Sequence, residues 1–467
     1  MIAFPTGAAV PWSAAQIAHV DQAIDAAIDR APLAGSHLGI LAIATETGRV
    51  VYARDADDAF IPASTLKLVT GSTALERLGP AGRFHTELDA RGPIAGGALS
   101  GDLILRAGGD PELQASDLTA AAAAVSATGI TVVRGNLVVD VSAYDPTRYG
   151  MGWSWDDFPF AYSAPISAIA IEENVVHVTV APAAAAGAPA TIAGIAPPGA
   201  ADRISIVDRV TTGARGSAST ADAFWGADGA IGVAGALPLG SASREIDVSV
   251  PSPVAYATAI LQAALQSAGV VVEPSPPAAE SSSVAAVLWS HESKPLAAIL
   301  ADCWLPSDNL IAEMLLRNVG LAASGAPAGA AAGIAVERDF LRSIGVDPSA
   351  VELVDGSGLS RENLLTPRSL AAVLDHDWQS PNRAVVLDAL PVAGVRGTLA
   401  HSDLGTPLVG RLFAKTGSMW HVSNVAGYLA TRAHGPVTIV ILADDALIDD
   451  AALARLRAQI LEALLDG

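Results

Sequence analysis

Ser64 and Lys67 are the first residues along the chain whose types and spacing could perform nucleophilic chemistry. They lie in the stretch PASTLK, directly after a proline and at the start of a segment with helical character. Residues three apart share one face of a helix, so the lysine amine can reach the serine hydroxyl. A serine becomes an effective nucleophile when a base takes its proton, and a buried lysine can be that base. The alternative is an ordinary helix start that Ser64 caps.

Lysine is rare in this chain, which makes the place of each one informative. The sequence contains three lysines, Lys67, Lys294 and Lys415, and arginine supplies the other 24 of the 27 basic residues. Lysine offers a compact amine that can lose its proton, which arginine does not. We therefore expect the lysines to mark positions that need such an amine.

Two later stretches carry further candidate groups. Ser307, Asp308 and Asn309 precede a helical segment, and Lys415-Thr416-Gly417 ends an apolar, strand-like run. Taken singly, the first stretch is explained as a turn with a helix cap, and the second as a strand that runs into a turn. Taken together in this order, S-x-x-K, S-x-N and K-T-G place two of the three lysines in one motif set, which favours a shared active site.

The segments that must position these groups show two kinds of sequence pattern, one helical with a few strands and the other a series of short β-like runs. Helical spacing over 13–30 follows Ser13 as a possible cap, and two strands are expected over 38–54 around a TETG turn. The helix over 64–78 ends at Gly79-Pro80. Helices return over 295–322 and 366–377, and the chain ends as strand, strand and helix over 421–431, 436–443 and 449–465.

The middle of the chain, residues 85–275, consists of short β-like runs separated by Gly, Ala and Pro stretches, and 181–201 reads as a low-complexity loop. The prediction is an α+β protein. Its catalytic domain, 1–85 and 276–467, is an antiparallel sheet flanked by helices. Two β-rich domains are inserted between the first and second motifs: domain II over 86–107 and 181–275, and domain III over 108–180.

Composition excludes some classes of function. The net charge is −21 over 467 residues, which disfavours binding to nucleic acid or to an anionic membrane. The single cysteine, Cys303, has apolar neighbours and is expected to be a buried thiol. The nine histidines show no metal-ligand spacing, so we expect no metal and no cofactor. Neither a membrane-spanning run nor a signal peptide is recognised.

On these motifs the sequence resembles the low-molecular-mass class C penicillin-binding proteins, the D-alanyl-D-alanine carboxypeptidases/endopeptidases. The 243 residues between Ser64 and Ser307 are similar to the long insert of that class, with its β-lactamase/transpeptidase-like catalytic domain. Further segments resemble the family over nearly the whole chain: GGDPELQASDL (108–118), FAYSAPISAI (160–169), VDGSGLSRENLLTP (354–367), LPVAGVRGTLA (390–400) and KTGSMWHVSNVAGYL (415–429).

The resemblance implies a role for each motif residue. Ser64 would be the nucleophile and Lys67 its base, with Asn309 holding the Lys67 side chain and the substrate carbonyl. Ser307 would relay a proton to the leaving nitrogen. Lys415 would help to keep Lys67 neutral. Thr416, Gly417 and Ser418 would form the edge that binds the terminal carboxylate, with Lys415 as its counter-charge. The backbone N–H groups of Ser64 and Ser418 would form the oxyanion hole. Asp308 and Asp355 have structural explanations, as a cap and a turn carboxylate.

Peptidoglycan stem peptides are the substrates that the resemblance implies, and some carry diaminopimelate. For that side chain we expect Asp157 to meet the ammonium and Arg361 the carboxylate. Tyr162 and Met419 would line the apolar stem. The alternative is that these are surface residues with no ligand.

Three other functions stay open at this point. A β-lactamase would need a deacylating glutamate, and the E-x-x-L-N segment that supplies it in class A enzymes has no match in RENLL (361–365). We therefore expect slow deacylation and covalent inhibition by β-lactams. The other two are a D-amino-acid amidase or esterase, and a non-catalytic muropeptide-binding or β-lactam-sensing module. The family's substrates place the expected action outside the cytoplasm, in the periplasm or at the cell-wall face, and leave open whether the protein associates with the membrane.

Overall fold

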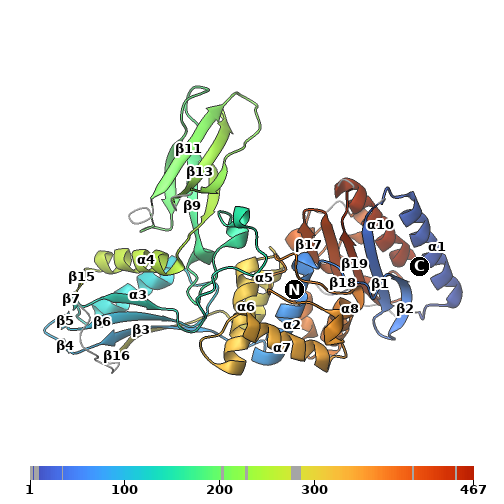
Figure 1. Ribbon diagram of the computed structural model, residues 1–467, viewed down its shortest axis with the longest axis horizontal. Helices are drawn as coiled ribbons and strands as arrows, with labels where there is room; N and C mark the ends of the chain where they lie inside the picture. Colours follow the sequence, from blue (N-terminus) through green and yellow to red (C-terminus); the bar gives the residue numbers. More distant parts are fainter. Residues whose placement is uncertain are drawn as a thin grey trace.

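The structure is a computed structural model, and it describes residues 4, 10–33, 35–200, 205–226, 230–274, 286–401, 404–447 and 450–467. The molecule has a helix-covered sheet at one end and an insert of several small sheets at the other (Figure 1). The insert leaves the chain after α2 (Lys67–Leu78) and returns before α5 (Leu296–Trp304). None of the described helices has the length and apolar character that crossing a bilayer requires.

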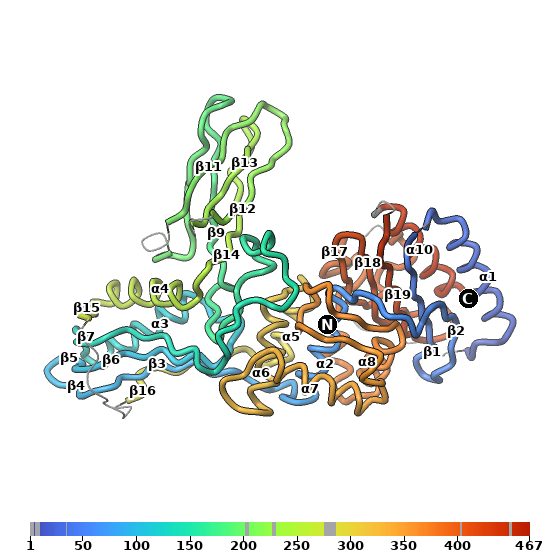
Figure 2. The backbone as a smooth tube through the Cα atoms, in the orientation of Figure 1, coloured from blue at the N-terminus to red at the C-terminus, as the bar shows by residue number. Residues whose placement is uncertain are grey.

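A five-stranded antiparallel sheet organises the catalytic end. Its strand order is β17-β18-β19-β1-β2. The strands are β17 (Leu412–Met419), β18 (Val422–Ala430), β19 (Pro436–Asp444), β1 (His37–Ala44) and β2 (Arg49–Arg54). The strands at the two ends of the chain therefore lie side by side in one sheet (Figure 2). This confirms the strands expected over 38–54, 421–431 and 436–443.

Both faces of this sheet are covered, and every residue of β19 is buried. Alternate residues of a strand point to opposite faces, and β19 divides in this way. Ile439 and Ile441 belong to the core beneath α1 (Ala14–Arg30) and α10 (Asp450–Asp466). Val440 and Leu442 belong to the core shared with the helices of the opposite face. That face carries α2, α6 (Asn309–Ser324), α7 (Ala330–Ser343), α8 (Pro367–Gln379) and α9 (Arg383–Ala389).

Two expected helices are interrupted at the motifs. The segment predicted as helix over 64–78 begins with a 3-10 turn, η1 (Ala63–Leu66), and becomes α-helical at Lys67. The segment predicted as helix over 295–322 is two helices, α5 and α6, which are separated at residues 305–308. Both interruptions place a motif serine on a non-α-helical turn beside a helix.

The described residues of the insert form four sheets. Two lie together beside α3 (Ala115–Ala127) and α4 (Pro253–Ser267): β16-β3-β6-β8 and β15-β7-β5-β4. These strands are β3 (His85–Arg91), β4 (Ile94–Ala95), β5 (Ala98–Leu99), β6 (Asp102–Ala107), β7 (Val132–Arg134), β8 (Leu137–Asp140), β15 (Val271–Glu273) and β16 (Ala286–Glu292). Neither α3 nor α4 was among the expected helices, because an alanine-rich segment shows little helical periodicity of apolar and polar residues.

The other two sheets form an arm that projects from the molecule (Figure 1). Their orders are β10-β9-β14 and β11-β13-β12. The strands are β9 (Val175–Ala181), β10 (Thr191–Ala196), β11 (Ile206–Gly213), β12 (Asp222–Trp225), β13 (Ile231–Pro238) and β14 (Arg244–Ser249). The low-complexity segment 181–201 is therefore not loop throughout, because it contains β10, which pairs with β9.

The sheet pairings bear on the expected division of the insert. The strands β6 and β8 pair directly, although the predicted boundary at residue 108 lies between them. We therefore propose that 85–140 with 253–292 is one unit of the insert and 175–249 the other. The segment 141–174 contains the short turns η2 (Trp155–Asp157), η3 (Ala161–Ser163) and η4 (Glu172–Asn174) and runs toward the catalytic end.

Candidate active site

Two side chains of the sheet hydrogen-bond to the backbone of the residues just before Ser64 and so hold Ser64 at the sheet. The amide nitrogen of Asn424 on β18 donates to the carbonyl oxygens of Ile61 and Pro62 at 2.8 and 2.9 Å. Asp444 at the end of β19 accepts from the Ile61 N–H at 2.7 Å. These contacts position the turn that carries the serine, so Asn424 and Asp444 act as positioning residues.

Lys67 lies directly beneath Ser64 and is completely buried. Its Nζ is 2.9 Å from Ser64 Oγ, 2.5 Å from Asn309 Oδ1 and 2.7 Å from the carbonyl oxygen of Ser357. The amine therefore has three polar neighbours, one of which is the candidate nucleophile. This is the geometry that a base needs in order to take the serine proton.

Burial lowers the pKa of Lys67 from its usual value, because a charged amine loses its hydration inside the protein. The negative charge of the Asp308 and Asp355 carboxyl groups opposes this shift. Cys303 is buried as expected, and burial raises its pKa to about 12, which disfavours the thiolate. The lowered pKa makes it easier for Lys67 to give up its proton and act as a base.

The second motif precedes α6. Ser307 has a left-handed backbone with φ of 71°, which turns its hydroxyl toward the sheet. Asp308 caps α6, since its Oδ1 accepts from the Ile311 N–H at 2.7 Å. This confirms the expected cap. Asn309 connects the catalytic end to the insert, because its Nδ2 donates to the carbonyl oxygen of Tyr162 at 2.7 Å while its Oδ1 accepts from Lys67.

The third motif is the last part of β17, the edge strand of the sheet. Lys415 is completely buried, and its Nζ is 2.8 Å from Ser307 Oγ and 2.8 Å from the carbonyl oxygen of Thr416. Burial, together with the nearby Lys67 amine, lowers the pKa of Lys415 well below its usual value. The two lysines thus flank the two serines, and each amine contacts one serine hydroxyl.

Gly417 allows the strand to approach the nucleophile closely. A Cβ at this position would lie 2.7 Å from the Pro62 carbonyl oxygen and 3.1 Å from the Ser64 nitrogen. No side chain fits that space without displacing the turn. Ser418 is the next residue of this strand, so the close approach also brings its backbone near the turn that carries Ser64.

The loop after α7 contacts Lys67 through the carbonyl oxygen of Ser357. Asp355 is buried and accepts from the N–H groups of Gly358 and Ser360 at 2.9 and 2.7 Å. Burial, together with the nearby Glu313 carboxylate, raises the pKa of Asp355 to about 6. Glu313 accepts from the N–H of Ser357 at 2.9 Å, and the Ser357 carbonyl in turn faces Lys67. The expected role of Asp355 as a turn carboxylate is confirmed.

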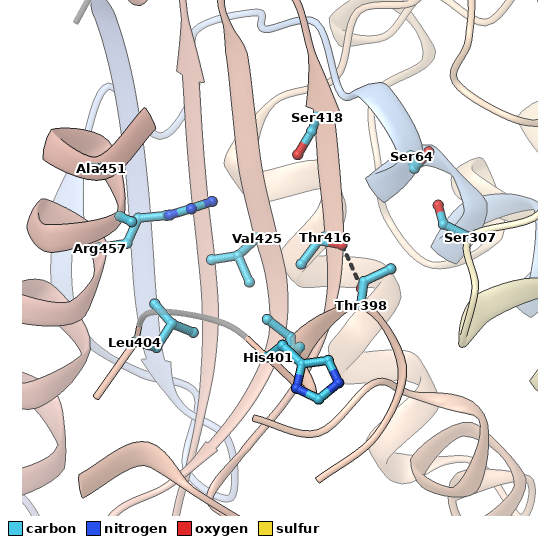
Figure 3. A pocket seen from close by; sticks show the side chains of 12 residues that line it. Ser64, Ser307, Thr398, His401, Leu404, Thr416, Ser418, Val425, Ala451 and Arg457 are labelled. Carbon is cyan, nitrogen blue, oxygen red and sulfur yellow. Dashed lines mark hydrogen bonds between the residues drawn. The ribbon is translucent and has the colours of Figure 1, made fainter. Parts of the chain in front are cut away.

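A cavity of about 590 Å³ opens beside the two serines. Figure 3 shows the hydroxyls of Ser64 and Ser307 on one side of it and the side chain of Arg457 reaching in from the α10 side. Thr398 was not anticipated, and its Oγ1 is 2.7 Å from that of Thr416. The full lining is Ser64, Ser307, Thr398, Leu399, His401, Leu404, Thr416, Ser418, Val425, Ala451, Ala454 and Arg457.

The four residues expected to read the substrate stem are not among those that line this cavity. Tyr162 donates from its hydroxyl to Asp157 Oδ1 at 2.8 Å, and both lie in the insert segment that contacts Asn309. Arg361 donates to the carbonyl oxygen of Trp420 at 2.9 Å, next to Met419. The structure brings together Asp157 with Tyr162, and places Arg361 beside the turn that follows Met419.

Lys294 corrects the expectation that every lysine marks a functional amine. Its side chain is 55% exposed and pairs with Glu112 and Asp302, each at 2.8 Å. These two partners raise the pKa of Lys294 above its usual value, so it stays charged. It is a surface ion pair that arginine could also form.

Comparison with known proteins agrees with this geometry. The chain is 37% identical over 436 residues to a D-alanyl-D-alanine carboxypeptidase of Actinomadura sp. strain R39, covering 89% of this chain and 79% of that protein. It is 30% identical over 413 residues to the D-alanyl-D-alanine carboxypeptidase DacB of Haemophilus influenzae, covering 86% and 84%.

A solved structure of penicillin binding protein 4 from H. influenzae superposes with a TM-score of 0.81 at 26% identity, covering 95% of this chain and 99% of that one. The same protein in complex with a β-lactam gives a TM-score of 0.78. The D-Ala-D-Ala carboxypeptidase 3 (S13) family matches residues 20–465. With Ser64 and Lys67 in contact beneath a K-T-G strand, and with matches of this extent, the chain belongs to the S13 family of D-Ala-D-Ala carboxypeptidases.

Proposed function

We propose that this protein is a serine D-Ala-D-Ala carboxypeptidase/endopeptidase that acts on peptidoglycan stem peptides through an acyl-enzyme on Ser64. The observation that carries the proposal is the 2.9 Å contact between Lys67 Nζ and Ser64 Oγ, made by a buried amine whose pKa burial lowers. Its S13 relatives are named as carboxypeptidases of this kind.

In the first step, Ser64 Oγ bonds to the carbonyl carbon of the penultimate D-alanine while its proton passes to Lys67 Nζ. The carbonyl oxygen becomes an oxyanion, which the N–H groups of Ser64 and Ser418 stabilise. The carbon–nitrogen bond then breaks, and the proton held by Lys67 Nζ passes through Ser307 Oγ to the leaving nitrogen, which frees Lys67 Nζ to accept another proton. Lys415, 2.8 Å from that oxygen, supports the transfer.

In the second step, water attacks the ester carbonyl carbon and gives a proton to Lys67, which returns it to Ser64 Oγ as the ester carbon–oxygen bond breaks and the shortened peptide leaves. No Asp or Glu is among the described residues that line the cavity, which supports slow deacylation of a bulky penicilloyl ester. This argues against a β-lactamase and in favour of lasting inhibition by β-lactams. Since peptidoglycan is the substrate, the protein would act outside the cytoplasm.

Fluorescent penicillin tests the acyl chemistry. We expect wild-type protein to be labelled covalently at Ser64, and the label to persist over many minutes. Ser64→Ala should abolish labelling, whereas Ser360→Ala, at a buried serine away from the cavity, should retain it if the protein folds. Rapid turnover of a chromogenic cephalosporin would overturn the carboxypeptidase assignment in favour of a β-lactamase. Folded protein that takes no label would indicate a binding module.

We further propose that the stem is read by Asp157, Tyr162, Arg361 and Met419, and that diaminopimelate is the third residue of the stem. The pair of Asp157 and Tyr162 lies in the segment whose Tyr162 carbonyl contacts Asn309, which supports a site next to the acyl side of the substrate. The Asp157 carboxylate suits the diaminopimelate ammonium, and the Arg361 guanidinium suits its carboxylate.

Paired substrates test the stem proposal. Asp157→Ala should lower kcat/KM on a diaminopimelyl peptide about tenfold or more, and change a simple acyl-D-Ala-D-Ala little. Asp156→Ala, at the exposed neighbouring aspartate, is the matched control. Equal losses on both substrates would show that Asp157 does not read the stem.

A further inference from the structure

The terminal carboxylate of the substrate needs a positive partner, and the amine of Lys415 is engaged inside the protein. The Lys415 side chain is completely buried, and its amine is engaged by Ser307 Oγ and by the Thr416 carbonyl. Its surroundings disfavour the charged form. The geometry therefore gives little support to the expected role of Lys415 as the counter-charge, and a second cation lines the cavity.

Arg457 is the arginine among the described residues that line the cavity. It lies on α10, and its Nη1 donates to Ser423 Oγ at 2.8 Å. Ser423 is the direct cross-strand partner of Ser418 in the β17–β18 register. The Cβ atoms of such a pair lie about 4.5–5.5 Å apart, so the guanidinium reaches the strand edge that carries Ser418. Figure 3 shows the Arg457 side chain reaching from α10 toward these strands.

We propose that Arg457 is the specificity-determining cation that binds the carboxylate of the leaving group, together with the hydroxyls of Thr416 and Ser418. The inference rests on the proposed acyl-transfer function and identifies how the same site selects its leaving group. A guanidinium gives a carboxylate two parallel hydrogen bonds, which fixes orientation as well as position.

The volume of the cavity also bears on the size of the leaving group. The cavity has the volume of a site for a drug-sized ligand, which is larger than a single alanine requires. The far side of the cavity, opposite the two serines, carries Leu404 and, on α10, Ala451 and Ala454, whereas Val425 lies between as the cross-strand partner of Thr416. These apolar and small side chains suit a methylene chain. The leaving amines that fit have a carboxylate on the carbon next to the nitrogen and a chain longer than the alanine methyl group.

Binding to a variant that cannot acylate tests the proposal independently of catalysis. On a Ser64→Ala background, calorimetry would compare three ligands: acyl-D-Ala-D-Ala, its C-terminal carboxamide, and acyl-D-Ala-D-norleucine. Arg457→Gln should raise the Kd of both acids by about tenfold or more, because a charge-assisted hydrogen bond is lost. The Kd of the carboxamide should change by less than about twofold. Arg457→Lys should recover part of the loss.

Two matched variants complete the test. Arg455→Gln, at an exposed arginine on the same helix, should leave all three affinities unchanged. Ala454→Phe should weaken the norleucine peptide more than the alanine peptide, because it fills the far side of the cavity. An equal effect of Arg457→Gln on acid and carboxamide, or no effect on either, would overturn the proposal. Failure of the acyl chemistry would appear separately, as wild-type protein that penicillin does not label.

Discussion

Two buried lysines and two serines alternate around the reacting centre, and each amine contacts one hydroxyl. The amine of Lys67 contacts the hydroxyl of Ser64, and the amine of Lys415 contacts that of Ser307. Removing an amine from water disfavours its charge, so burial lowers the pKa of both lysines. Asn309 adds a neutral partner that orients the Lys67 amine.

Gly417 offers a test of how closely the K-T-G strand must approach the nucleophile. We predict that Gly417→Ala slows acylation by fluorescent penicillin at least tenfold, because its methyl group would press on the Pro62 carbonyl and the Ser64 nitrogen. Circular dichroism should show an intact fold. Gly194→Ala is the control, since its Cβ would meet nothing nearer than 3.9 Å. Acylation at the wild-type rate in Gly417→Ala would contradict the close approach.

The motif residues were predictable because chemistry fixes their types and local spacing. Ser64, Lys67, Ser307, Asn309 and Lys415 lie together as expected. Asn424 and Asp444 were not predictable, since each reaches a turn more than 360 residues away in the sequence. An asparagine in a strand or an aspartate at its end gives no local signal of such a contact. Only the sheet register brings these side chains to Ser64.

At the scale of elements, the site depends on where helices begin. Both motif serines lie on turns next to a helix, and both turns contain a left-handed residue, Ala63 with φ of 45° and Ser307 with φ of 71°. Helical periodicity predicted α2 and α6, but it could not locate the breaks, because apolar spacing continues across them. The breaks follow from contacts with the sheet and with the loop after α7.

The packing of α2 against α8 predicts a dependence of stability on pH. Burial raises the pKa of Asp377 to about 7, and the hydroxyl of Ser72 donates to its Oδ2 at 2.7 Å. Between about pH 4 and 7, the folded protein therefore keeps a proton that the unfolded chain has lost. The stabilisation is complete below about pH 4 and is lost as the pH rises to about 7.

We predict that Asp377→Asn removes this loss. As the pH rises from 4 to 8, the free energy of unfolding of the variant should fall less than that of wild type, by about 1 kcal/mol or more. Thermal unfolding midpoints measured across this range would show it. Asp375→Asn, at a less buried position on the same helix, should follow the wild-type curve. A parallel pH dependence in Asp377→Asn and wild type would contradict the prediction.

At the scale of the whole molecule, the insert is tied to the catalytic end by hydrogen bonds at its base. Trp153 donates from Nε1 to Asp355 Oδ2 at 3.0 Å, and Tyr144 donates from its hydroxyl to Asn318 Oδ1 at 2.7 Å. The Tyr162 carbonyl reaches Asn309. The expected insertion between the first two motifs is thus a structural support for the site. The boundaries between the parts of the insert could not be predicted from the pattern of short β-like runs, because strands distant in sequence share its sheets.

Trp153 tests that coupling. Trp153→Phe should lower the free energy of unfolding by about 1–3 kcal/mol, because a buried carboxyl group loses a donor. Acylation should also slow, since the Asp355 loop provides the Ser357 carbonyl that faces Lys67. Trp155→Phe, at a residue that is 76% exposed, is the control. If Trp153→Phe matches the control in both stability and acylation rate, the insert does not support the site through this bond.

The distribution of lysines has a practical consequence for handling the protein. Lys67 and Lys415 are sealed inside the fold, and the Lys294 side chain is 55% exposed. Among the lysine side chains, amine-directed coupling can therefore reach Lys294, and its ion pairs with Glu112 and Asp302 would slow the reaction because a charged amine is not a nucleophile. A dye or surface linker attached at Lys294, away from the two serines, would leave the reactive centre open to large cell-wall fragments.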